Sequence, residues 1–217
     1  MMLEKKISNE QCMALDGSVI PHSAMWARNI SYFKRPVSNT RPTSRVSLGH
    51  LAEYIRGDYY RQETEKLRAI SDPKERRKFK ATHFDSVTFC GLFAERKDDQ
   101  LLCPSDFLCL DFDHLGDRLT EVHQQLIMDP EFETVLLFRS PSGDGLKWIV
   151  KIDLTSCDYA TWYQAVLNYV FAIYQVKADD QCRNLSRACF LCYDPEAYVN
   201  PSFYPSELKN NSYYAEI

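Results

Sequence analysis

The order of the expected secondary-structure elements constrains the fold of this chain more than any other feature. From residue 108 on, the pattern reads strand, helix, strand, strand, helix, strand. The strands are expected from alternating or continuous apolar runs at 108–113, 134–139, 146–154 and 188–193. Apolar residues at helical spacing predict one helix capped by Asp117 and a second opened by Ser156 or Asp158. This order is typical of a split βαβ sheet.

The sequence therefore predicts an α+β fold whose core is an RRM-like antiparallel sheet with one face open to a ligand. A helical extension precedes that core, with helices expected after Ser47, over 59–70 and after Pro73. Residues 1–46 are expected to be irregular and 86–93 to be strand-like. The expected parts are an N-terminal basic and helical extension, a core and an irregular tail, at 1–80, 81–200 and 201–217.

Composition places the chain among ordinary globular proteins. It has 217 residues, of which 45% are hydrophobic and 26% are charged. No apolar run approaches the roughly 18–20 residues of a membrane span, and the first residues lack the apolar stretch of a secretory signal. We therefore expect a cytoplasmic protein with no membrane partner. The eight cysteines are expected to be reduced and no zinc is expected, because Cys189 and Cys192 enclose strand-like residues.

Basic residues gather in the first part of the chain. Residues 17–52 contain no acid, and aromatic residues such as Trp26 stand among their basic side chains. Basic and aromatic residues together suit a nucleic-acid backbone and its bases. The predicted nucleic-acid contacts are Arg28, Lys34, Arg35, Arg41 and Arg45, with Lys78 and Lys80 from a second basic run. The alternative interpretations are an ordinary positive loop and a solvated helix face.

Two acids stand on one face of the first core strand. If 108–113 is a strand, Leu108, Leu110 and Phe112 share one face, and Asp111 and Asp113 share the other. Two carboxylates at this spacing can hold one divalent cation, or divide two between them. The alternative is a strand that simply ends in acidic residues.

A glycine-containing turn links the next two strands. Two of the seven glycines of the chain fall within residues 140–147. Glycine permits a left-handed backbone, and successive backbone N–H groups can hold an anion. The predicted phosphate-binding residues are Ser140, Ser142, Gly143, Gly145 and Lys147. A plain hairpin turn is the alternative.

A third polar segment precedes the last expected strand. Asp179 or Asp180 can supply another carboxylate, and Arg187 can bind a phosphate with two parallel hydrogen bonds. The alternative is a polar loop with a surface Asp–Arg pair. An acid pair, a phosphate turn and an acid with an arginine, each at a strand end, together indicate metal-assisted nucleotidyl transfer.

These segments resemble two related groups of proteins. The arrangement resembles the primase-polymerase domain of the archaeo-eukaryotic primase superfamily. More closely, the chain resembles the VirE N-terminal-like domain of proteins from Bacteroides mobile elements. The matching stretches are 87–93, 110–115, 138–147, 184–187 and 193–200.

The resemblance implies roles for particular residues. Asp111 and Asp113 would be metal-binding acids of the superfamily's first motif, and Asp179, with Asp180 as its rival, the third acid. The second motif of the superfamily normally ends in a nucleotide-binding histidine, whereas this chain has Lys147 there. Lysine can hold a phosphate, but it lacks the acceptor of a neutral imidazole. This departure bears on polymerase activity more than on nucleotide binding.

Two functions follow as hypotheses. In the first, Mg²⁺ or Mn²⁺ at Asp111, Asp113 and Asp179 supports synthesis of a primer from nucleoside triphosphates on single-stranded DNA during DNA replication. In the second, the domain is a non-catalytic nucleic-acid-binding accessory module of a replication protein. The family domain often precedes a helicase-type ATPase module, and this chain has no GxxxxGK[ST] motif of its own. Such a module is therefore an expected partner.

Overall fold

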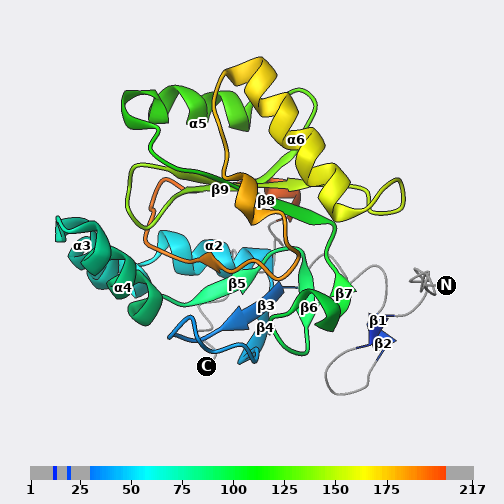
Figure 1. Ribbon diagram of the computed structural model, residues 1–217, viewed down its shortest axis with the longest axis horizontal. Helices are drawn as coiled ribbons and strands as arrows, with labels where there is room; N and C mark the ends of the chain where they lie inside the picture. The colour runs from blue at the N-terminus through cyan, green and yellow to red at the C-terminus, as the bar shows by residue number, and fades with distance from the viewer. Residues whose placement is uncertain (1–11, 14–18, 21–29, 204–217) are drawn as a thin grey trace.

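Two antiparallel four-stranded sheets form the framework of the protein (Figure 1). The computed structural model describes residues 12–13, 19–20 and 30–203. The first sheet has the strand order β12 (Tyr198–Val199), β9 (Thr134–Arg139), β10 (Leu146–Lys151), β8 (Phe107–Phe112). The second has the order β11 (Cys189–Phe190), β5 (Ser86–Thr88), β3 (Ile30–Phe33), β4 (Ser44–Val46). Two short hairpins complete the described strands: β1 (Cys12–Met13) with β2 (Val19–Ile20), and β6 (Gly91–Phe93) with β7 (Leu101–Pro104).

The first sheet contains the expected split βαβ unit. Helix α5 (Leu119–Ile127) connects β8 to β9, and β10 pairs antiparallel with both strands. β8 and β9 are therefore parallel to each other, with β10 between them. The α+β prediction is confirmed. The helix starts differ in detail: Asp117 lies in a short 3-10 turn and not at the cap of α5, whereas the Asp158 side chain caps α6 (Tyr159–Tyr174).

Helices α5 and α6 cover one face of the first sheet (Figure 1). Leu108, Leu110 and Phe112 of β8 are buried in one core with apolar residues of both helices. Their alternation leaves Cys109 and Asp111 on the opposite face, as the sequence predicted for Asp111. Asp113 was expected to end the same strand, but β8 stops at Phe112 and Asp113 is exposed just after it. The apolar half of β8 anchors the strand, so its polar half is held in a defined position.

The opposite face of the first sheet is covered too, and the prediction of an open face is wrong. Leu136 and Phe138 of β9 and Ile149 of β10 pack with α2 (Leu48–Arg56) and with the second sheet. Figure 1 shows α2, β3 and β5 on the side of the first sheet that is away from α5 and α6. An uncovered apolar face would cost free energy in water. Polar groups on this side therefore lie where the two sheets meet.

The predicted fourth core strand lies in the second sheet. Only Cys189 and Phe190 of the expected 188–193 strand are extended, and they pair with β5 instead of extending the first sheet beside β8. The RRM-like order of four strands in one sheet is therefore not reproduced. The returning strand is also shorter than expected, because β10 ends at Lys151.

The N-terminal region contributes strands that the sequence analysis missed. Residues 30–33 were expected to be irregular but form β3, whose four side chains are all buried between β4 and β5. The helical extension is present as α2, α3 (Arg61–Ala69) and α4 (Pro73–His83), with Ser47 and Asp72 as side-chain caps of α2 and α4. The second of these helices begins with a 3-10 turn at Asp58–Tyr60.

The strand-like run 86–93 divides between two sheets at Gly91. A side chain at Gly91 would lie 2.2 Å from the carbonyl oxygen of Cys103, so only glycine allows β6 and β7 to approach this closely. Cys103 is disulfide-bonded, so the expectation of fully reduced cysteines is wrong at this residue. Within residues 30–203, none of the helices has both the length and the apolar character needed to cross a membrane.

Candidate functional site

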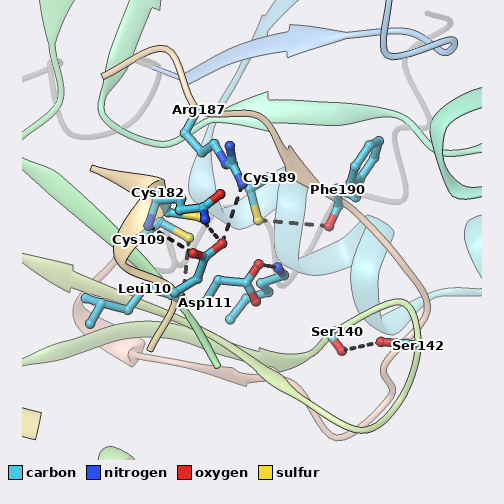
Figure 2. A network of polar contacts seen from close by, with 12 residues as sticks. Cys109, Leu110, Asp111, Ser140, Ser142, Cys182, Arg187, Cys189 and Phe190 are labelled. Atoms are coloured by element: carbon cyan, nitrogen blue, oxygen red, sulfur yellow. Dashed lines mark hydrogen bonds and ion pairs between the residues drawn. The ribbon is translucent and has the colours of Figure 1, made fainter. Parts of the chain in front are cut away.

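A small cavity lies where β8 and β10 meet β11 and the loop that follows α6. Figure 2 shows Cys109, Asp111, Cys182, Arg187 and Cys189 gathered there. Its volume is about 20 Å³, which is enough for about one water molecule. Any ligand larger than a water molecule therefore needs the lining residues to move apart. The lining residues are Phe89, Cys90, Cys109, Asp111, Lys147, Tyr159, Cys182, Leu185, Arg187, Ala188 and Cys189.

Asp111 and Lys147 form a cross-strand ion pair at the base of this cavity. They are register partners on β8 and β10, and Lys147 is only 7% exposed. Burial alone would lower the pKa of Lys147, but the charge of Asp111 outweighs it and raises that pKa above its ordinary 10.5. Asp111 Oδ1 is buried and has no hydrogen-bond partner among the described residues. One carboxylate oxygen is thus neutralised, while the other is buried without a partner among the described residues.

Asp113 and Lys80 stand close to this pair. Desolvation by the surrounding protein, followed by the negative charge of Asp111, raises the pKa of Asp113. Burial, followed by the positive charge of Lys147, lowers the pKa of Lys80, although both acids oppose this change. Lys80 comes from α4, and its ammonium lies 5.6 Å from the centre of the Phe190 ring. The basic helix therefore contributes to this site as well as to the surface.

Asp179 links the loop after α6 to β8. Its backbone N–H donates to the carbonyl oxygen of Asp111 at 2.8 Å, and its carboxylate lies 3.5 Å from Arg187. Burial alone would raise the pKa of Asp179, but hydrogen bonds from the Gln181 N–H and the Cys182 thiol, with the Arg187 charge, lower it. Of the two rival acids, Asp179 is the one in contact with β8, whereas Asp180 is exposed.

The glycine turn lies next to Lys147, at the start of β10. Two of its N–H groups are used within the turn, since Ser140 donates to Gly145 and Gly143 donates to Ser140. The hydroxyl groups of Ser140 and Ser142 share a hydrogen bond of 3.1 Å, apart from the acid group in Figure 2. A side chain at Gly145 would lie 2.1 Å from the Phe112 carbonyl oxygen, so the turn packs tightly against the end of β8.

Asp144 and His114 hold this turn to the segment after β8. The His114 Nδ1–H donates to Asp144 Oδ2 at 2.9 Å, because a carboxylate can only accept. Burial alone would raise the pKa of Asp144, but hydrogen bonds from Ser142 and His114 outweigh it and lower the pKa below its ordinary 3.8. The Leu115 N–H adds a bond to the Asp144 carbonyl oxygen. These contacts make the turn a well-fixed element.

Thiols form the remainder of the cavity wall. Cys90, Cys109, Cys182 and Cys189 are free thiols that line the cavity. Burial raises the pKa of Cys90, and a hydrogen bond with Cys189 together with burial raises the pKa of Cys109. The Cys90 and Cys109 thiols are therefore protonated. Within residues 30–203, no group of three or more His, Cys, Asp or Glu side chains is placed to hold a metal ion.

The other predicted nucleic-acid contacts lie away from the cavity lining. Lys34 and Arg35 follow β3, Arg45 lies on β4, and Arg41 stands exposed between these strands. Arg35 Nη1 donates to the His83 carbonyl oxygen at 2.9 Å, which ties this segment to the end of α4. Lys78 is exposed on α4. Arg28 lies outside the described residues.

The structure also shows residues at the site that the sequence analysis did not single out. Arg68 of α3 donates from Nε to the Pro141 carbonyl oxygen at 3.3 Å, and His114 binds Asp144. His114 directly follows the acid pair, and its backbone is left-handed at φ 57°. Its position beside Asp113 was a usable signal. No feature of the sequence near Arg68 pointed to this contact, since 73 positions separate it from Pro141.

The fold and the site define an α+β domain with a cluster of paired acids and bases where two sheets meet. A family model described as the BT4734-like, N-terminal domain matches residues 78–199, which is more than half of the chain. The chain therefore belongs to the BT4734-like N-terminal domain family. The match includes the acid pair, the glycine turn and the 179–187 segment. No curated protein and no solved structure matches the chain.

Proposed function

We propose that this domain is a primase-polymerase-like nucleotidyltransferase of bacterial mobile-element replication, acting on single-stranded DNA and related to VirE N-terminal-like domains. The observation that carries the proposal is the convergence of three polar segments at one cavity. Asp111, Lys147 and Arg187 lie on segments far apart in the sequence, yet all three line it. Acids that suit a divalent cation and bases that suit a phosphate are the two requirements of metal-assisted nucleotidyl transfer.

The acids fit a hard cation in their chemistry. Asp111 Oδ1 is buried without a hydrogen-bond partner among the described residues, and desolvation, followed by the nearby charge of Asp111, raises the pKa of Asp113. Asp111 and Asp113 would hold Mg²⁺ or Mn²⁺, with Asp179 as the third acid. When bound, the metal supplies positive charge that neutralises a triphosphate.

The bases have a role both before and during substrate binding. Lys147 neutralises Asp111, and Arg187 lies 3.5 Å from Asp179, so both acids are charge-compensated without substrate. An incoming triphosphate offers Lys147 and Arg187 new acceptors. When these two bases leave Asp111 and Asp179 for the phosphates, the two carboxylates become free to bind a metal ion. Lys147 would act as a point charge, while Arg187 would bind two phosphate oxygens at once.

The first test is a synthesis assay. The protein is incubated with labelled nucleotides, Mg²⁺ or Mn²⁺ and single-stranded DNA, and the products are separated on a gel. Asp111→Asn should abolish products that depend on template and metal. Asp117→Asn is the matched control, because Asp117 is an exposed acid in the 3-10 turn before α5. Undiminished synthesis by a folded Asp111→Asn protein would refute the assignment.

A non-catalytic nucleic-acid-binding module is the second candidate. The observation that favours it is the Asp111–Lys147 pair, in which an ammonium already occupies the position beside the acid that a metal would take. This candidate predicts salt-sensitive binding of single-stranded DNA that is unchanged by Mg²⁺ and by Asp111→Asn. A helicase-type ATPase module would then supply the catalytic step of the assembly.

A further inference from the structure

Arg68 connects the helical extension to the glycine turn. Its guanidinium donates from Nε to the Pro141 carbonyl oxygen at 3.3 Å and from Nη2 to the Ser140 carbonyl oxygen at 3.5 Å. A side chain at Gly143 would lie 3.0 Å from Arg68 Nε, so the guanidinium rests directly against the turn. Gly143 has φ +86°, a conformation that glycine adopts readily.

These contacts do not neutralise the positive charge of Arg68. Both acceptors are neutral carbonyl oxygens, and no carboxylate within residues 30–203 forms an ion pair with Arg68. A guanidinium has five N–H donors, and these bonds use only two of them. Arg68 therefore keeps a full positive charge and unused donors beside the turn.

Arg61, on the same helix, provides a contrast. Its guanidinium bonds to Asp58 at 3.2 Å and to Glu65 at 3.1 Å, and it lies 5.4 Å from the centre of the Tyr193 ring. The two arginines thus share a helix and a charge, but only Arg68 faces the glycine turn without a carboxylate.

We propose that Arg68 is an anion-binding residue of the glycine turn and takes a backbone phosphate of single-stranded nucleic acid. A chain of phosphates is favoured over a single small anion, because α4 packs beside α3 and continues the positive charge with Lys78 and Lys80. The inference rests on the nucleic-acid binding of the proposed function and adds a contact from outside the predicted core.

The test is the salt dependence of binding. A fluorescently labelled oligonucleotide is titrated with wild type, Arg68→Gln and Arg61→Gln over a series of salt concentrations. The logarithm of the binding constant falls linearly with the logarithm of the salt concentration, and each lost phosphate contact makes that negative slope shallower by about 0.7 for single strands. We expect that decrease for Arg68→Gln and an unchanged slope for Arg61→Gln. Glutamine keeps a donor for the turn carbonyls, so a merely structural Arg68 would leave the slope unchanged.

The outcomes separate the two proposals. If the wild type fails to bind the oligonucleotide, both the proposed function and the assignment of Arg68 are refuted. If the wild type binds and Arg68→Gln keeps its slope, or Arg61→Gln loses as much, the assignment of Arg68 is wrong. Should Arg68→Gln not fold, Arg68→Lys replaces it, because lysine keeps the charge and loses the planar fork. It should bind several-fold more weakly than Arg61→Lys, and equal binding would overturn the assignment.

Discussion

Replacing Lys147 by methionine tests the ion pair on which the site depends. Methionine keeps an apolar stem of similar length and removes the ammonium, so Asp111 loses its cation without a large cavity forming. The side chain of Lys147 is 9% exposed and that of Asp111 is 19% exposed. The carboxylate would thus stay largely buried, with Oδ1 still lacking a hydrogen-bond partner among the described residues.

The cost follows from this burial. Removing one partner of a buried pair costs about 3–5 kcal/mol, because the other charge is left uncompensated. The remaining exposure of Asp111 and the nearby charge of Lys80 place the expected loss near the lower end, at about 3 kcal/mol. For a protein of this size, that loss lowers the melting temperature by about 6–12 °C.

Urea unfolding of the wild type and the variant measures this loss. The unfolding midpoint should fall with an unchanged denaturant slope. Lys97→Met is the control, because Lys97 pairs with Glu95 where the side chains are 58% and 32% exposed. Such an exposed pair contributes about 0–1 kcal/mol, so this variant should stay close to the wild type.

The double variant Lys147→Met with Asp111→Leu completes the test. Replacing both charges by apolar groups removes the uncompensated carboxylate, so at least half of the lost stability should return. A Lys147→Met protein within about 1 kcal/mol of the wild type would refute the reasoning, since Lys147 would then not be compensating a buried charge. So would a double variant less stable than Lys147→Met alone.

Two further predictions concern the glycine turn. Gly145→Ala should destabilise the protein by about 1–3 kcal/mol, because its Cβ would lie 2.1 Å from the Phe112 carbonyl oxygen; thermal unfolding measures this loss, and an unchanged melting temperature would contradict it. Asp144→Asn should be less stable than the wild type at neutral pH, and the difference should close as pH falls below about 4. The pKa of Asp144 is lowered because its hydrogen bonds, including that from Ser142, outweigh burial, so its stabilising effect is present above the ordinary 3.8 and is lost as the carboxylate gains a proton. Melting temperatures from pH 3 to pH 7 check this, and a constant difference would contradict it.

Local patterns account for the parts of the fold that the sequence predicted correctly. The alternation of Leu108, Leu110 and Phe112 with Asp111 places apolar and polar side chains on opposite faces of one strand, whatever that strand packs against. The caps at Ser47 and Asp158 likewise act within one helical turn. Strand alternation and helix caps depend only on residues close together in the chain, so they can be predicted directly from the sequence.

Tertiary structure decided which face stays covered and which strands pair. Residues 30–33 are too short and too close to prolines to read as a strand alone, yet they are buried between β4 and β5. Residues 189–190 looked like a core strand and joined the second sheet. A short strand takes its place from the partner that buries it, and that partner is distant in the sequence.

The candidate site divides in the same way. The sequence by itself determined which chemical groups are present: two acids separated by one residue, a glycine turn ending in Lys147, and an acid with Arg187. Only the tertiary structure decided that Lys147 neutralises Asp111 and that Arg68 reaches the turn. Residue type and local spacing are properties of short segments. Contact between distant segments depends on how the whole chain packs, because each sheet must bury its apolar faces before its polar side chains acquire neighbours.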